Sequence, residues 1–443
     1  MRAARTLLML MAALLSLTLP ARAAGIIRDS EIEYALRELA RPLASAAGVS
    51  MGTLRIYLID DRRLNAFVVD QQTMFLHTGL FLRLTTAEQV QAVMAHEIGH
   101  IANGHITRRG IASGSARTAA GIGLLLAAAA GAISGNAEAA AGLAVGSQSV
   151  AQRAYFAHTR GEEASADQAG LRYMATAGVN PQAAAEVLDL FRGQEALSAG
   201  RQDAYVQSHP LTRDRLRAVE AFVAALDYEG TPDEGAAYWF GRAQAKLEGF
   251  SRNPSEVLRR APARDTSDAA TLRRALAWHR QAKTDQALEE IDRLIARRPG
   301  DPYPVETKAQ ILLESKRFAE AAKVYARAAS MAPGDPLILG GQGRALLAAG
   351  DYRAALPVLE KAAARDVADP RLLRDLATAY AKSGNDGMAA LSVAEARAIL
   401  GQLADARTLA VRASGLLPEG SPGWRRAQDV IRVADRAVKR KRN

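Results

Sequence analysis

The amino-acid sequence predicts a mainly α-helical protein in which a domain with a small β-sheet is followed by an α-solenoid. Three observations support this prediction. Apolar residues recur at helical spacing early in the chain, two strand-like runs occupy 54–59 and 67–76, and the second half repeats with a period of 34 residues. The 49% hydrophobic content is ample for cores in the two or three domains that 443 residues suggest.

The first 23 residues have the three parts of a secretion signal. Arg2 and Arg5 are basic, Leu7 to Leu19 is apolar, and Ala21-Arg22-Ala23 is a small-x-small cleavage site. The apolar part is shorter than a membrane span, which needs about 20 residues. We therefore expect 1–23 to be cleaved near Ala23 and the remaining chain to be exported. An uncleaved anchor and a hydrophobic first helix are the alternatives.

The predicted first domain covers 24–228. Residues 29–43 have the apolar spacing of an amphipathic helix. Leu54 to Ile59 and Phe67 to Leu76 follow as strands, and Asp70-Gln71-Gln72 breaks the second run into a hairpin.

Two further helices of this domain carry polar clusters. Thr85 and Glu88 form the spacing of a capping box, which opens the helix that contains three of the seven histidines. A later helix runs from about Gln152 to Ala177 and is stopped by Gly178. The acidic, apolar-poor stretch 227–236 then predicts a domain boundary.

The rest of the chain is predicted to be a repeat array over 233–420, followed by a C-terminal helix and basic tail over 421–443. Asp-Pro recurs at 301, 335 and 369, and small residues recur within these units at Ala309, Gly343 and Ala377. A 34-residue period with small residues where two helices cross is typical of tetratricopeptide repeats. After Gly401 the phase shifts by half a repeat. The alternative is an irregular helical bundle.

Residues 118–150 are rich in Ala and Gly and have two interpretations. The segment is too weakly apolar to predict a transmembrane span. It is either a helical hairpin packed beside the site or a mobile segment that covers the cleft or makes peripheral contact with a membrane.

Composition excludes several kinds of site. The chain has no cysteine, so disulfides, cysteine-ligated metals and cysteine nucleophiles are excluded. The formal charge of +10 is dispersed along the sequence without interleaved aromatic residues, which disfavours a nucleic-acid partner.

His96-Glu97-Ile98-Gly99-His100 is an HEXXH motif on a predicted helix. Residues four apart lie one turn apart on the same face, so both imidazoles can bind one metal ion. Glu97 is close enough to take a proton from a metal-bound water without binding the metal. His105 comes nine residues after His96, so we expect it to face away from the metal and to have a structural or surface role. The alternative for the motif is a pair of surface histidines.

Two His ligands leave a further ligand to be found elsewhere in the sequence. Glu162, Glu163 and Asp167 lie on the later helix, with Glu163 and Asp167 four apart on one face. One of this pair can bind the metal while the other orients a ligand histidine. The alternative is a solvated acidic face.

The motifs together resemble the HtpX/CAAX-prenyl-protease-type zinc metallopeptidases. The resemblance covers about 65–215 and rests on these residues: HEIGH at 96–100, Glu163 with Asp167 and Gly170, Asn65-Ala66-Phe67, Thr78-Gly79-Leu80, Ser208-His209-Pro210-Leu211 and Arg215. It implies a zincin-type metalloprotease domain that binds one zinc ion per chain. It also implies His96, His100 and Glu163 as zinc ligands, Glu97 as general base and Asp167 as a partner of a ligand. His209 is implied to lie near the metal, either stabilising the oxyanion or occupying the open zinc position as a brake.

With a signal peptide and C-terminal repeats, the resemblance implies a zinc endopeptidase of the bacterial periplasm. Its implied substrates are misfolded or stalled envelope proteins, and its repeats would bind the outer-membrane assembly machinery with a chaperone role. The alternative is a mostly latent peptidase whose repeats act as a chaperone or adaptor. Edge pairing with the strand near Phe67–Val69 or Met74–His77 would bind substrate.

Overall fold

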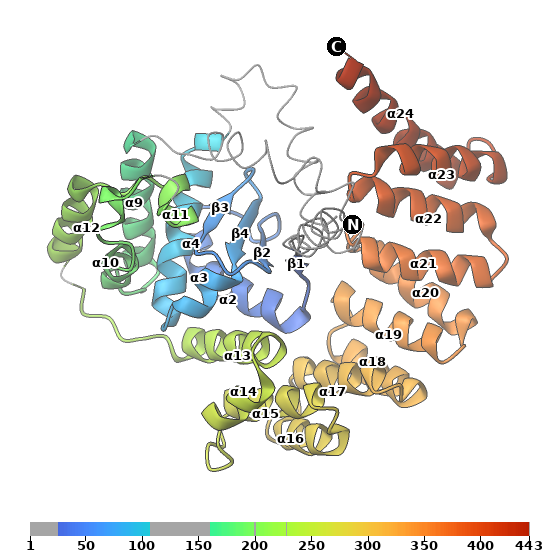
Figure 1. Cartoon of the computed structure of the whole chain (residues 1–443), viewed down its shortest axis with the longest axis horizontal. Coiled ribbons are helices and arrows are strands. Elements are labelled where there is room, and N and C mark those ends of the chain that lie inside the picture. Colours follow the sequence, from blue (N-terminus) through green and yellow to red (C-terminus); the bar gives the residue numbers. More distant parts are fainter. Residues whose placement is uncertain (1–24, 107–159, 199–200, 227, 443) are drawn as a thin grey trace, which may run out of the picture.

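A computed structural model describes residues 25–106, 160–198, 201–226 and 228–442 (Figure 1). The predicted signal at 1–23 and the Ala/Gly-rich segment at 118–150 lie outside these residues. Among the described residues, no helix combines the length and the apolar character needed to cross a bilayer.

The first domain contains a four-stranded sheet with the order β1-β2-β4-β3. Its strands are β1 (Ile26–Ile27), β2 (Arg55–Ile59), β3 (Ala66–Val68) and β4 (Thr73–His77). Strand β4 pairs in parallel with β2 and antiparallel with β3, so it is central and all five of its residues are buried. The predicted hairpin at 70–72 is confirmed: the Asp70 side chain accepts hydrogen bonds from the Gln72 N–H and the Thr73 hydroxyl.

Helices pack beside this sheet to complete the first domain (Figure 1). They are α2 (Ser30–Ala46), α3 (Thr78–Arg83), α4 (Ala87–Ala102), α9 (Arg160–Thr176), α10 (Gln182–Asp189), η2 (Gln194–Ala196), α11 (Ala204–Ser208) and α12 (Arg213–Leu226). Asp29 caps α2, in agreement with the helix predicted from residue 29.

The predicted capping box of α4 is wrong by one residue. Thr86, not Thr85, is the N-cap, and its hydroxyl accepts the Gln89 N–H. The Gln89 side chain in turn accepts the Thr85 N–H, so Gln89 replaces Glu88 in the box. Thr86 has the extended backbone that an N-cap requires, and this could not be distinguished in the sequence Thr-Thr.

The second half of the chain is a stack of helices that curves beside the first domain (Figure 1). Its members are α13 (Glu234–Ser251), α14 (Pro254–Arg260), α15 (Asp268–Arg280), α16 (Thr284–Arg297), α17 (Pro302–Glu314), α18 (Phe318–Met331), α19 (Pro336–Ala348), α20 (Tyr352–Ala363), α21 (Pro370–Lys382), α22 (Asp386–Ile399), α23 (Leu403–Leu416) and α24 (Pro422–Arg442). Helices α15, α17, α19 and α21 begin 34 residues apart, and so do α16, α18, α20 and α22. The predicted α-solenoid is therefore confirmed.

Helix α13 joins the two halves. Its Phe240, Ala243 and Leu247 belong to the apolar core of the first domain, and the helix also packs against α15 of the array. Because α13 contacts α2 as well, the array is attached to the first domain through a buried surface and not only through the linker before it.

At crowded helix crossings of the repeats, replacing glycine by alanine should destabilise the protein, although alanine normally favours a helix. A Cβ atom on Gly343 of α19 would lie 2.4 Å from Leu359 Cγ of α20, whereas one on Gly241 of α13 would meet no atom within 4 Å. We expect Gly241→Ala to raise the free energy of unfolding by about 0.5–1 kcal/mol, as alanine does in a helix. Gly343→Ala should lower it by about 1–3 kcal/mol through overpacking. Urea denaturation measures both, and an equal gain in both variants would contradict the tight crossing.

Candidate metal centre

Helices α4 and α9 carry the predicted site residues and cross at two glycines. A Cβ atom on Gly99 of α4 would lie 2.8 Å from the Ala166 carbonyl oxygen of α9. A Cβ atom on Gly170 of α9 would lie 3.1 Å from the Ala95 carbonyl carbon of α4. Side chains at these positions would therefore push the two backbones apart, and glycine allows them to approach.

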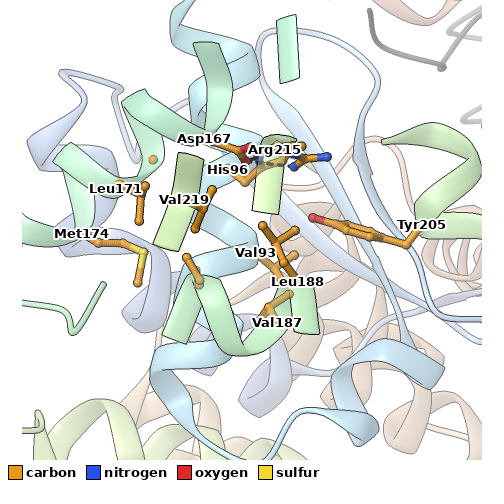
Figure 2. Close-up of a pocket in the computed structure, with 13 residues that line it drawn as sticks. Val93, His96, Asp167, Leu171, Met174, Val187, Leu188, Tyr205, Arg215 and Val219 are labelled. Carbon is orange, nitrogen blue, oxygen red and sulfur yellow. Dashed lines mark hydrogen bonds and ion pairs between the residues drawn. The ribbon is translucent and has the colours of Figure 1, made fainter. Parts of the chain in front are cut away.

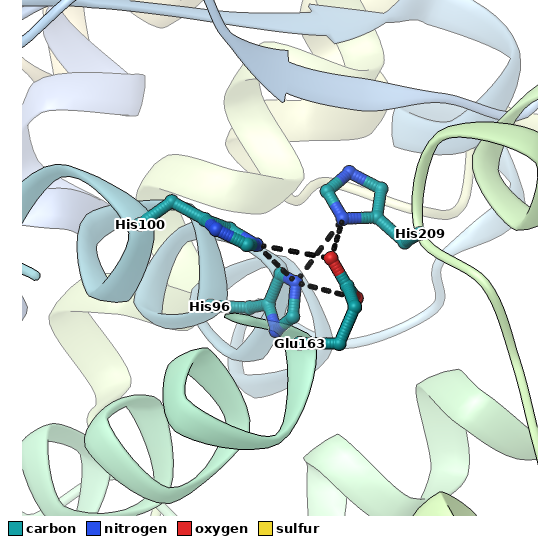
Figure 3. Close-up of side chains that lie close together, drawn as sticks. All are labelled: His96, His100, Glu163 and His209. Carbon is teal, nitrogen blue, oxygen red and sulfur yellow. Dashed lines mark hydrogen bonds and ion pairs between the residues drawn. The ribbon is translucent and has the colours of Figure 1, made fainter. Parts of the chain in front are cut away.

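The crossing brings four buried side chains into one group, His96, His100, Glu163 and His209 (Figure 3). His96 Nε2 lies 3.0 Å from His100 Nε2 and 3.2 Å from His209 Nδ1. Glu163 Oε1 lies 3.3 Å from His100 Nε2 and 3.1 Å from His209 Nδ1, and Glu163 Oε2 lies 3.4 Å from His96 Nε2. One potential ligand atom of each residue therefore points to a common centre.

These distances of 3.0–3.4 Å, which count both oxygens of Glu163, are close to those between the ligand atoms of a tetrahedral zinc site. With bonds of about 2.0–2.1 Å, the ligand atoms of a tetrahedral site lie about 3.3 Å apart. Imidazole nitrogen and carboxylate oxygen are also ligands that zinc accepts. Three histidines and one carboxylate would fill all four positions, so the group has the form of a closed site.

His209 reaches this group from the segment between α11 and α12. Its Nδ1 faces the ligand atoms, while its Nε2 lies 3.1 Å from the Ala66 carbonyl oxygen of β3 and 3.3 Å from Glu97 Oε1. The Tyr205 ring packs against the imidazole with the centroids 4.7 Å apart. Of the two roles left open by the sequence, this arrangement favours a place in the ligand group.

Asp167 and Arg215 contact the candidate ligand residues on the side away from the common centre. Asp167 Oδ1 lies 2.8 Å from His96 Nδ1, which leaves His96 Nε2 to face the centre. Arg215 contacts Asp167 through Nε at 2.6 Å and Nη2 at 2.9 Å, and Glu163 Oε2 through Nη1 at 2.6 Å. One guanidinium thus fixes the carboxylates of two successive turns of α9.

The same three residues, His96, Asp167 and Arg215, line one side of a pocket whose other walls are mainly apolar (Figure 2). Burial there opposes the ionisation of Asp167, but Arg215 and the hydrogen bond to His96 lower its pKa to about 2. Burial likewise opposes the ionisation of Glu163, and His209 and Arg215 outweigh it and hold the Glu163 pKa well below its usual value. Both carboxylates are therefore anions at neutral pH.

Glu97 lies beside the ligand group without joining it. Its side chain is fully buried, and His209 Nε2 is 3.3 Å from its Oε1. Burial raises the pKa of the Glu97 carboxyl, and the neighbouring His209 and His96 act in the opposite direction. A carboxyl with a raised pKa next to a metal site suits proton transfer.

The structure thus brings together His96, Glu97, His100, Glu163, Asp167 and His209. It corrects the orientation expected for His105 and leaves it outside the ligand group, in a structural role. His105 does not face away: it is buried, and its Nδ1 lies 2.8 Å from His100 Nδ1. The helical extrapolation fails because α4 ends at Ala102 and Gly104 has a positive φ of 65°. The contacts of Arg215 and Tyr205 were not foreseen. For Arg215 the only signal was its place among the residues of the family resemblance, six positions after His209.

Comparisons with known proteins point to a peptidase family. Residues 29–223 match the profile of peptidase family M48. A putative beta-barrel assembly-enhancing protease of Vibrio cholerae is 28% identical over 250 residues, which are 50% of this chain and 50% of that protein. The beta-barrel assembly-enhancing protease of Escherichia coli K12 is 25% identical over 317 residues, or 67% of this chain and 61% of that protein. Protease HtpX of Vibrio cholerae is 36% identical over 101 residues, or 21% of this chain and 34% of that protein.

The chain therefore spans between half and about three-fifths of the length of these assembly-enhancing proteases. Among solved structures, MamA from Desulfovibrio magneticus RS-1 superposes on 37% of this chain and 95% of its own, with 16% identity and a TM-score of 0.32. That similarity is too weak to support an inference.

The double contact of Arg215 predicts a loss of metal affinity on a conservative change. Arg215→Lys keeps the charge but cannot bridge two carboxylates with a planar fork. We expect its zinc affinity, measured by competition with a chromogenic chelator, to fall about 10–100-fold. Arg217→Lys is the matched control, because Arg217 lies on the same helix with its side chain 75% exposed. Unchanged affinity in a folded Arg215→Lys protein would contradict the role of Arg215.

Proposed function

We propose that the peptidase family M48 domain of this chain is a zinc-dependent endopeptidase. One observation carries the proposal: His96, His100 and Glu163 converge with tetrahedral spacing, and the buried Glu97 lies next to them. In this assignment the three residues bind one zinc ion, Glu97 is the general base and Asp167 orients His96. A bound zinc ion supplies Lewis acidity for the peptide carbonyl and lowers the pKa of water.

In this assignment Glu97 makes both proton transfers, and Asp167 and Arg215 keep a ligand in place. Glu97 takes a proton from the attacking water and returns it to the leaving amine, a role for which burial and a raised pKa are suited. Asp167 and Arg215 keep the Nε2 atom of His96 directed at the centre during this cycle. Neither needs to change its charge.

Substrate binding by strand addition is supported for β3. Of the two strands that the sequence offered, β4 is paired on both sides, whereas within the described residues β3 pairs only with β4. Phe67 pairs directly with Phe75, and His77 N–H donates to Asn65, so the backbone groups of Ala66 and Val68 point to the free edge. An extended peptide that pairs with this edge would lie beside the ligand group.

In this arrangement His209 blocks both the open metal position and the strand edge that catalysis on a peptide would need. Its Nδ1 would fill the fourth ligand position of a bound metal ion. Its Nε2 lies 3.1 Å from the Ala66 carbonyl oxygen, which belongs to the free edge of β3. A catalytic zinc site keeps one position open for water or substrate. We therefore assign His209 as a brake that must leave before the peptide is bound.

We propose that the protein acts in the bacterial periplasm, a location that its similarity to the assembly-enhancing relatives supports. There it would remove misfolded or stalled envelope proteins, and its repeat array would bind components of outer-membrane protein assembly. The blocked site favours a second candidate function, in which the peptidase is mostly latent and the array acts as a chaperone or adaptor. The two functions differ in whether release of His209 produces proteolysis.

The assignment of Glu97 predicts that Glu97→Gln abolishes proteolysis and spares the metal. The substitution removes the proton acceptor and keeps the shape, so the cleavage rate of an unfolded protein such as casein should fall about 10²–10⁴-fold. Zinc content, measured by atomic absorption, should stay near one per chain. Glu88→Gln in the first turn of the same helix is the control and should cleave normally. Cleavage retained by Glu97→Gln would sink the endopeptidase assignment.

The assignment of His209 predicts that His209→Ala increases activity. If the brake is engaged in about nine-tenths of the molecules, its removal should raise the casein cleavage rate about tenfold. His279→Ala is the control, because His279 pairs with Glu314 in the repeat array. A lower rate would instead assign His209 to the chemistry itself, and no change would remove it from the site.

A further inference from the structure

Equivalent aspartates of three successive repeat units contact α13 or the chain at the start of α2. Asp301, Asp335 and Asp369 are the N-caps of α17, α19 and α21. Asp301 Oδ2 is 3.1 Å from Arg242 Nη1, Asp335 Oδ1 accepts the Ser30 hydroxyl at 3.2 Å, and Asp369 Oδ2 is 3.7 Å from Arg28 Nη1. Two of these caps thus also contact the start of the first domain, and the third contacts α13, which packs against it.

One end of this contact is deeply buried. Glu31, Arg242 and Lys246 have no exposed surface, and Glu31 lies 2.5 Å from Arg242 Nη2 and 3.4 Å from Lys246 Nζ. Lys246 also binds Asp29 at 3.0 Å and Glu306 at 3.1 Å. Removing one partner of such a group leaves an uncompensated buried charge and is strongly destabilising. The buried group around Glu31 therefore keeps the first domain attached to the first units of the array in the folded protein.

The other end is formed by a single arginine. Arg28 Nη2 lies 2.5 Å from Asp366 Oδ2, and Asp369 is the second carboxylate of the array near the guanidinium. Glu33 binds Arg28 Nε at 2.6 Å, and the guanidinium carbon lies 5.3 Å from the centre of the Tyr57 ring. A bound arginine usually has carboxylates at the edge of its planar guanidinium and an aromatic ring against the guanidinium face.

The array departs from its own repeat where Arg28 binds. The residue three before the Asp of Asp-Pro is Arg298 in the first of these turns, Ala332 in the second and Asp366 in the third. The third turn also replaces Pro-Gly with Val367-Ala368, and Val367 is 71% exposed. The repeat fold does not require an acidic pair here, because the other two turns form without it. The pair is a property of this unit alone among the three.

We propose that Asp366 and Asp369 form a binding site for an arginine side chain of a partner polypeptide. In the structure described here, Arg28 of the same chain occupies this site. A partner arginine would compete with Arg28 for the same carboxylates. Its binding would free α21 and the helices after it from the first domain, while the buried group around Glu31 keeps the earlier units attached. This proposal does not depend on the peptidase activity.

Removing the Arg28 side chain from the Asp366 and Asp369 site tests the proposal in the full-length protein. Arg28→Ala should lower the midpoint of thermal unfolding, and millimolar N-acetyl-L-arginine amide should restore about half of the loss or more by binding the folded state. N-acetyl-L-lysine amide has a point charge without the planar fork and should restore much less. Arg28→Gln, which retains a hydrogen-bonding side chain, is the second variant if Arg28→Ala does not fold.

Two controls separate this site from general effects of the additive. Arg344→Ala breaks another ion pair of the array, with Asp375 at 2.7 Å, and arginine amide should not restore its midpoint. Adding Asp366→Asn to Arg28→Ala should abolish the restoration. Absence of restoration, equal restoration of Arg344→Ala, or restoration that survives Asp366→Asn would overturn the proposal.

Discussion

The crossing of α4 and α9 at Gly99 and Gly170 is the constraint on which the site depends. It brings two histidines of one helix and a glutamate of the other to tetrahedral spacing around one point. The cost is a buried group of carboxylates and imidazoles, which is stable only if every charge has a partner. Arg215 supplies that partner for both carboxylates of α9, and a metal ion would supply it for the remaining lone pairs.

The local features of the chain could be predicted from its sequence because each depends on residues near one another. The spacing of His96 and His100 on one helix face, the hairpin around Asp70 and the 34-residue period are of this kind. Each follows from backbone geometry with a known period or turn. Where local geometry changed, prediction failed: Gly104 ends the helical course, and His105 turns back onto His100.

Long-range contacts could not be derived from spacing. Nothing in the sequence places Arg28 beside Asp366, 338 positions later, or gives Arg215 two carboxylates. The position of His209 was indicated only by resemblance to a family, and its contact with the Ala66 carbonyl had no signal at all. These contacts join separate elements, so no local pattern of the sequence could predict them.

The coordination of the bound metal tests the central claim most directly. X-ray absorption at the zinc edge of the metal-loaded protein reports the number of imidazole ligands from their multiple-scattering signal. Four nitrogen or oxygen ligands near 2.0 Å, three of them imidazoles, are expected if His209 completes the group formed by His96, His100 and Glu163. The His209→Ala protein should retain two imidazoles. Two imidazoles already in the unaltered protein would contradict the closed site.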